Sequence, residues 1–358
     1  MSRLVDAPSR SFLRSGGWVV VAALALTGLA VSVHVVALLG SRSRAIGNGR
    51  DVSSYGFDLG GANIPPAEIV AGGLPKDGLP ALVEPAVWTL QEADRQSAGR
   101  ARFLVPSDRV VGVVSGGEAR AYPLRFLVWH EVVNDTLGGT AIAVTYNPLS
   151  DGAAVFRRSG PAGTRIFGVS GLLYQSSLLF YDRQPAGRAE SLFSQLLCRA
   201  VAGPAASGPE RLDVLPSAVA TWGDWRGLEP ATTVLAPDPR LRAQYRRDPY
   251  EAYFGSDILR FPVHPLPPKE RGPLKTPVLA LQVEGRWHAF PFDAVRRHAD
   301  AAGRWRTNAG GIAVDLQFRK ERPETVIARP VSSPPLPTLQ AFSFAWYALQ
   351  AEATVWHD

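Results

Sequence analysis

The chain has 358 residues, of which 46% are hydrophobic, and a formal net charge of +6. Its basic residues are mostly arginines scattered along the chain, whereas a nucleic-acid-binding surface concentrates them on one face, so we expect no nucleic-acid binding. The single cysteine, Cys198, excludes an intrachain disulfide and a cysteine-only metal site within this sequence, and we expect it to be a small buried side chain.

The N-terminal segment predicts a membrane anchor. Residues 1–16 form a short basic tail, and residues 17–40 contain no charged side chain. At about 1.5 Å per residue this span makes a helix of roughly 36 Å, long enough for a hydrocarbon core and longer than the apolar part of a cleavable signal, about 7–15 residues. Basic residues also follow the span, but a short basic tail favours the cytoplasm. We therefore expect a single-pass signal anchor in the cytoplasmic membrane, with the rest of the chain extracytoplasmic.

The chain after the anchor divides into a linker and a domain. Residues 41–64 are rich in Gly, Ser and Arg and predict a flexible linker, and residues 65–356 predict a globular domain. Inside it, Val110–Ser115 and Glu118–Tyr122 flank a glycine pair, which is typical of a tight hairpin, and Pro123 suits the start of a short helix. Further strands are predicted at Thr140–Tyr146, Ala153–Arg157, Arg165–Ser170 and Leu178–Asp182. The fold class is therefore α+β and rich in strands.

The hairpin pattern returns near the C-terminus. At a constant offset of 168 residues, four residues of the first pattern match four of the second, namely Gly117, Ala121, Tyr122 and Pro123 with Gly285, Ala289, Phe290 and Pro291. His130 matches His298 at the same offset, and a glycine pair precedes Ile-Ala-Val in both halves. These matches predict an internal repeat, about 108–160 and 276–328, and two related sheet lobes. The alternative is that two units made of a hairpin and a short helix resemble one another without common origin.

Polar side chains concentrate inside the first repeat. His130, Glu131, Asn134, Asp135 and Tyr146 lie between segments apolar enough to be buried, and we predict that they line a pocket for a small ligand or ion. In this hypothesis His130 and Asp135 supply the polar contacts and Tyr146 forms a wall. The alternative interpretation is that Asn134 and Asp135 cap a turn through bonds from their side chains to the backbone.

The catalytic candidates are His130, Glu131 and Asp135. They do not make a zinc motif, because that motif needs a second histidine four residues after the first, where this chain has Asn134, so we predict no metal site. No nucleophile elbow frames Ser150, and no phosphate-binding loop or dinucleotide fingerprint is present, so nucleotide binding has no support and the sequence leaves the cofactor unknown. The remaining enzymatic alternative is a hydrolase or transferase with His130 as general base, oriented by either carboxylate.

Four long segments carry a family resemblance. They are GGLPKDGLPAL (72–82), GEARAYPLRFLVWHEVVND (117–135), GVSGLLYQSSLLFYDR (168–183) and ESLFSQLL (190–197). They resemble the bacterial and archaeal family called domain of unknown function 3179. The resemblance implies no particular activity, but many members look membrane-anchored or extracytoplasmic. Relatives typically carry a Cys-x-x-Cys, suited to metal or redox work, where this chain has Asn147 and Ser150, so thiol chemistry of that form is excluded here.

The leading interpretation is a membrane-anchored extracytoplasmic protein that binds a small ligand or ion in the polar pocket or supports an envelope assembly. The hydrolase or transferase is the second interpretation. A scaffold without any ligand is the third, and the missing cysteine pair is what favours it.

Overall fold

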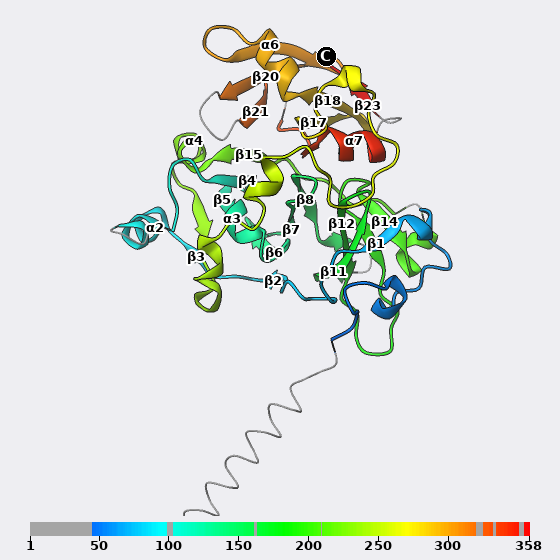
Figure 1. Ribbon diagram of the computed structural model, residues 1–358. Helices are drawn as coiled ribbons and strands as arrows, with labels where there is room; N and C mark the ends of the chain where they lie inside the picture. Colours follow the sequence, from blue (N-terminus) through cyan, green and yellow to red (C-terminus); the bar gives the residue numbers. More distant parts are fainter. Residues whose placement is uncertain are drawn as a thin grey trace, which may run out of the picture. The chain divides into compact units, whose positions relative to one another are not determined.

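The computed structural model describes most of the chain after the predicted anchor (Figure 1). The described residues are 45–98, 103–160, 163–208, 210–319, 325–331, 334–350 and 354–358. The predicted tail and anchor, residues 1–40, lie outside them. Among the described residues, no helix is both long enough and apolar enough to cross a membrane.

The folded unit begins earlier than the sequence predicted. Residues from Ile46 to Asp358 form one compact unit, so the predicted linker 41–64 is wrong over most of its described part. The short 3₁₀ helix η2 (Val52–Tyr55) is capped by the Asp51 side chain, and Tyr55 is only 1% exposed. The aromatic ring of Tyr55 packs in a buried hydrophobic cluster and holds this glycine-rich segment against the rest of the fold. The composition of the segment did not indicate this packing.

An eight-stranded central sheet runs through both halves of the chain. Its strands, in spatial order, are β2 (Leu82–Val83), β6 (Val132–Leu137), β7 (Thr140–Asn147), β8 (Gly152–Arg157), β22 (Thr338–Phe342), β17 (Pro277–Val283), β18 (Arg286–Pro291) and β23 (Thr354–Trp356). β8 of the first predicted repeat and β17 of the second are joined through β22. The two repeats therefore share one sheet.

Two five-stranded sheets pack on opposite faces of β6, β7 and β8, left and right of them in Figure 1. The β4 sheet contains β15 (Ala218–Thr221), β4 (Arg109–Ser115), β5 (Glu118–Pro123), β16 (Thr233–Leu235) and β3 (Val87–Trp88). The β11 sheet contains β1 (Ile69–Ala71), β11 (Phe167–Tyr174), β12 (Ser177–Asp182), β13 (Leu192–Ser194) and β14 (Arg199–Ala202).

The remaining elements lie outside these three sheets. A three-stranded sheet is formed by β19 (Arg304–Ala309), β20 (Ile312–Arg319) and β21 (Thr325–Pro330), and a two-stranded ribbon by β9 (Ser159–Gly160) and β10 (Gly163–Thr164). The α-helices are α2 (Leu90–Ser97), α3 (Leu124–Leu127), α4 (Trp222–Leu228), α5 (Glu251–Phe254), α6 (Phe292–His298) and α7 (Ser343–Gln350). Further 3₁₀ helices are η3 (Pro66–Glu68), η4 (Pro204–Ser207), η5 (Pro239–Leu241), η6 (Gln244–Arg246) and η7 (Lys269–Arg271). The prediction of a β-rich α+β fold is confirmed.

The core lies on both faces of the central sheet because side chains alternate along a strand. Val132, Ala143 and Phe156 face the β11 sheet and pack against its phenylalanines. Val144 and Tyr146 face the β4 sheet and helix α3. Side chains of neighbouring residues on one strand therefore point to opposite faces of the central sheet. This alternation decides on which face each candidate site residue lies.

Both predicted repeats follow the same order of elements. The hairpin β4–β5 ends in Pro123 and is followed by α3, and the hairpin β17–β18 ends in Pro291 and is followed by α6. A second hairpin follows each helix, β6–β7 in the first half and β19–β20 in the second. The second hairpins pair differently, because β6–β7 belongs to the central sheet whereas β19–β20 lies in the three-stranded sheet.

Candidate functional site

His130 is held by both of its ring nitrogens. Nδ1 lies 2.7 Å from the carbonyl oxygen of Pro80, and Nε2 lies 2.6 Å from the hydroxyl of Tyr245. The side chain has no exposed surface, and burial lowers its pKa, although the bond to Pro80 opposes this effect. His130 therefore joins the segment before β2 to η6 and offers no free nitrogen to a ligand.

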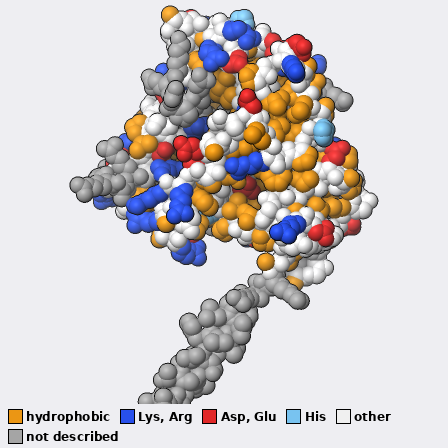
Figure 2. All heavy atoms as spheres, viewed as in Figure 1, with side chains coloured by type: hydrophobic (Ala, Val, Ile, Leu, Met, Phe, Trp, Pro, Cys, Tyr) orange, Lys and Arg blue, Asp and Glu red, His pale blue; other side chains and the backbone are white. Residues whose placement is uncertain are grey.

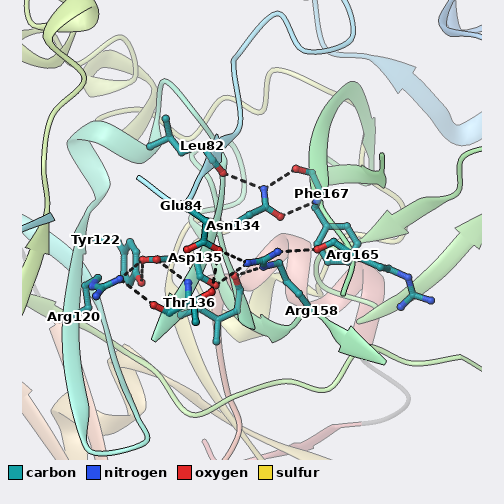
Figure 3. Close-up of polar contacts among 11 residues, drawn as sticks. Leu82, Glu84, Arg120, Tyr122, Asn134, Asp135, Thr136, Arg158, Arg165 and Phe167 are labelled. Atoms are coloured by element: carbon teal, nitrogen blue, oxygen red, sulfur yellow. Dashed lines mark hydrogen bonds and ion pairs between the residues drawn. The ribbon is translucent and has the colours of Figure 1, made fainter. Parts of the chain in front are cut away.

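Asn134 lies inside β6 and connects the central sheet to the β11 sheet. Its Nδ2 donates to the carbonyl oxygens of Leu82 (3.1 Å) and Phe167 (2.8 Å), and its Oδ1 accepts from the backbone N–H of Phe167 (2.7 Å). Figure 3 shows this side chain directed toward Phe167. Both polar atoms of this side chain are therefore bonded to backbone groups of other elements, so its role in the fold is structural.

Asp135, the next residue, connects β6 to β5. Its Oδ2 accepts from the Arg120 guanidinium (2.6 Å) and the Tyr122 hydroxyl (2.7 Å), and its Oδ1 accepts from the backbone N–H of Thr136 (2.8 Å). In Figure 3 it points away from Asn134, toward Arg120 and Tyr122. The side-chain-to-backbone bonds of the alternative interpretation are present for both residues, but they do not cap a turn, because β6 continues to Leu137.

Tyr146 lies at the end of β7, in a polar cluster with Asp151. Its hydroxyl donates to Asp151 Oδ1 (2.9 Å), and Arg109 donates to both carboxylate oxygens of Asp151 at 2.9 and 2.8 Å. Gln340 of β22 donates to the same carboxylate (3.0 Å). Asp151 is 1% exposed, so four hydrogen bonds compensate its removal from water.

This cluster lines the inner part of a pocket of about 630 Å³, which we call the basic pocket. The pocket lies where β7 and β22 end and β8, β17 and β4 begin, and η6 and α5 border it. Its apolar lining consists of Leu124, Val128, Phe254, Pro277 and Phe342, and its charged lining of Asp108, Arg109, Arg125, Asp151, Arg246, Arg247, Asp248 and Lys275. Five cationic and three anionic side chains give the lining a net charge of +2.

The excess charge of the basic pocket comes from Arg246, Arg247 and Lys275, and the charge of Asp248 opposes it in part. Arg109 pairs with Asp151, Arg125 pairs with Asp108 at 3.1 Å, and Lys275 donates to three backbone carbonyls. Arg246 and Arg247 are exposed and form no ion pair within the described parts of the chain. On the face drawn in Figure 2, Lys and Arg side chains gather near the place of β3, beside hydrophobic side chains.

Glu131 lines a second, much smaller space, which we call the Glu131 cavity. Its volume is about 50 Å³, and apart from Glu131 its lining is mostly apolar: Gly72, Leu74, Pro75, Leu79, Leu149, Val169, Gly171, Leu172, Leu173 and Tyr250. Glu131 Oε1 accepts from Asn147 Nδ2 (3.1 Å), and Asn147 Oδ1 accepts from the N–H and hydroxyl of Ser150. Burial raises the pKa of Glu131 to about 7, and the bond from Asn147 opposes this only in part.

The structure does not bring the five predicted site residues into one pocket. Tyr146 contributes to the basic pocket and Glu131 to its own cavity, whereas His130, Asn134 and Asp135 bond to neighbouring elements. Among the described residues, no group of three or more His, Cys, Asp or Glu is placed to hold a metal ion. Cys198 is 5% exposed, as predicted, and burial raises the pKa of its thiol to about 12.

The residues that give the basic pocket its charge were not predicted from the sequence. Arg109, Asp151, Arg246 and Arg247 lie up to 138 residues apart in the chain, and strand pairing brings them together. The adjacent arginines at 246 and 247 were the feature of the sequence that could have indicated this pocket. The arginine-rich composition of the whole chain concealed it.

These observations define a β-rich α+β protein with a large basic pocket and a small acidic cavity at one end of its central sheet. The chain belongs to the family described as "Protein of unknown function (DUF3179)", whose model matches residues 76–353. Neither a curated protein nor a solved structure matches the chain. Three of the segments that carry the family resemblance, 72–82, 117–135 and 168–183, contribute residues to the Glu131 cavity.

Proposed function

We propose that this protein binds a small organic anion in the basic pocket. The observation that carries the proposal is a pocket of about 630 Å³ with apolar walls and two arginines that have no ion-pair partner among the described residues. Ligand pockets commonly have volumes of about 300–1,000 Å³, mostly apolar walls and a few polar groups that orient the ligand. Arg246 and Arg247 would bind a carboxylate or phosphate, since a guanidinium donates two parallel hydrogen bonds to either.

The apolar part of the ligand would pack on Phe254 and Phe342. The buried cluster of Arg109, Tyr146 and Asp151 would form a rigid polar floor beneath it, because each of these side chains is already fixed by hydrogen bonds. The ligand site therefore lies in the basic pocket and not around His130, where the sequence predicted it. Of the predicted site residues, Tyr146 lines this pocket. A role for His130 as general base has little support, because both ring nitrogens are bonded and the ring is buried.

The test is the identity of the small molecules that copurify with the protein. Full-length protein is purified, denatured, and its released molecules are identified by mass spectrometry. We expect an organic anion at a near-stoichiometric level, and the variant Arg246→Ala/Arg247→Ala should bind it roughly ten- to hundredfold more weakly. Arg296→Ala/Arg297→Ala is the matched control, because it removes two adjacent exposed arginines from α6. Equal retention by both variants, or a neutral or cationic ligand, would refute the proposal.

We also propose that residues 17–40 anchor the protein in the cytoplasmic membrane, with the folded unit outside the cytoplasm. The uncharged span and the basic tail before it support this arrangement. Alkaline phosphatase, which is active only outside the cytoplasm, provides the test when it is fused after Asp358. An inactive fusion that is produced in full would contradict the proposed orientation.

We further propose that the two halves arose by duplication. The shared order of elements supports this, as do the glycine pairs of the second hairpins, in which Gly138, Gly139, Gly310 and Gly311 all have positive φ. Superposition of residues 109–147 on 277–319 in an experimental structure is the test. Unrelated paths of the two second hairpins relative to the first would contradict a common origin.

A further inference from the structure

The Glu131 cavity contains an acidic side chain that the proposed anion site does not use. Glu131 is 8% exposed, and it forms no ion pair with any residue that the structure describes. Its carboxylate has two oxygens, and the bond from Asn147 engages one of them. A buried carboxylate normally has a cationic or hydrogen-bonding partner, because removing its charge from water is unfavourable.

The walls of the cavity limit what that partner is. No other acidic or basic side chain lines it, and Tyr250 is the one further titratable group among the described lining residues. Two basic side chains outside the lining have other partners. Arg260 packs on the ring of Tyr250 at 5.2 Å, and Lys76 is paired with Glu190. Burial, and then the charge of Glu131, raises the pKa of Tyr250 to about 12, so this phenol is neutral. An anion would therefore meet only repulsion from Glu131.

The size of the cavity further limits which ligands it can hold. A volume of about 50 Å³ holds roughly three to five groups the size of a water molecule, since one such group needs about 10–15 Å³. Aliphatic walls such as Leu79, Leu149 and Val169 suit methylene groups. An aromatic ring attracts a cation through its face.

We propose that the Glu131 cavity binds the protonated end of a small primary amine, with Glu131 as its counter-ion and the Tyr250 ring beside it. The ammonium group would donate one hydrogen bond to the free carboxylate oxygen of Glu131, and its first methylene groups would fill the apolar part of the cavity. This site lies apart from the proposed anion site, because Tyr146, which lines the basic pocket, and Asn147, which binds Glu131, are neighbours on β7 and face opposite sides of it.

Ethylammonium is the probe, and sodium, potassium and tetramethylammonium chlorides at equal concentration are the controls. Thermal unfolding of the full-length protein is followed at pH 8. Ethylammonium should raise the melting temperature by about 2 °C at ten times its Kd, and further with the logarithm of its concentration. Glu131→Gln should weaken this binding at least tenfold. Tyr250→Leu should weaken it severalfold, while Tyr250→Phe should retain it.

Proton release gives a second measurement that does not depend on a variant. At pH 6.5 most Glu131 side chains are protonated, and binding of an ammonium ion should release roughly 0.8 proton per site, measured by calorimetry in two buffers of different ionisation enthalpy. The proposal is overturned by an absence of saturable binding, by binding without proton release, or by equal effects of ethylammonium and any control cation. Retention of full binding by Glu131→Gln would also overturn it.

Discussion

The substitution Glu131→Gln should remove a pH dependence from the stability of this protein. In the unfolded chain this carboxyl group ionises near its ordinary pKa of 4.5, whereas in the folded protein burial raises the pKa to about 7. The folded state therefore holds the proton more tightly than the unfolded state. Below about pH 4.5 Glu131 is protonated in both states, and its ionisation does not lower the unfolding free energy. As the pH rises from there through 7, the unfolding free energy falls.

The pKa difference sets the size of the effect. At 1.36 kcal/mol per pKa unit, a rise from 4.5 to about 7 is worth about 3 kcal/mol in full, and about 2.5 kcal/mol of this falls between pH 5 and pH 8. Glutamine has nearly the same shape and accepts the same hydrogen bond from Asn147, but it does not ionise. The variant should therefore gain about 2.5 kcal/mol relative to the natural protein when the pH rises from 5 to 8.

Urea unfolding of both full-length proteins at the two pH values, followed by tryptophan fluorescence, measures this double difference. All other titrating groups cancel because they are present in both proteins. Glu118→Gln is the matched control, because this side chain is exposed at the start of β5 and lies outside the Glu131 cavity. A double difference below about 1 kcal/mol would show that Glu131 ionises freely in the folded protein and would contradict the burial of its carboxyl group in the Glu131 cavity.

Three further predictions concern the fold around the two sites. Asn134→Ala should lower the unfolding free energy by about 3–5 kcal/mol because it leaves buried groups of Leu82 and Phe167 without partners, whereas Asn308→Ala, at an exposed position of β19, should cost less than about 1 kcal/mol. Similar urea curves for both would contradict the structural role of Asn134. Asp135→Ala should cost about 3–5 kcal/mol because it leaves the Arg120 charge buried, while Asp213→Ala, which breaks an exposed pair with Arg157, should cost under about 1 kcal/mol. A small loss for Asp135→Ala would show that Arg120 finds another partner. Gly171→Ala should be more destabilising than Gly187→Ala by about 1 kcal/mol or more, because both have φ near +80° but only at Gly171 would the Cβ lie 2.5 Å from a carbonyl oxygen. Equal melting temperatures for these two variants would contradict the close packing of the 72–75 segment on Gly171.

Local sequence signals predicted the hairpins well. The glycine pair between β4 and β5 fixes both the turn and the register, because its residues adopt positive φ without strain, and Pro123 then starts α3 as expected. β11 was predicted too early and too short. It contains a register shift between Val169 and Leu172, where the period-two pattern is interrupted, and such a bulge depends on the neighbouring strand rather than on local propensity.

The candidate site was less predictable because polar side chains in a buried strand serve two different purposes. Asn134 and Asp135 stand in adjacent positions of β6 and look alike in the sequence, but each bonds to a different neighbouring sheet. Nothing in the local pattern distinguishes such a connector from a ligand-binding residue. The basic pocket was hidden for a related reason: β8 reaches β17 only through β22, a contact between residues far apart in the chain.

The turn between β7 and β8 connects the two proposed sites physically. On one side of it, Asn147 and Ser150 hold the Glu131 side chain, and on the other, Asp151 holds Tyr146. The hydroxyl of Tyr253 binds the carbonyl oxygen of Leu149 between them, at 2.7 Å. A substitution in this turn would disturb both sites at once and would not show which of them binds a ligand. Arg246, Arg247 and Tyr250 contribute to one site each and lie outside the turn, so their variants separate the anion site from the amine site.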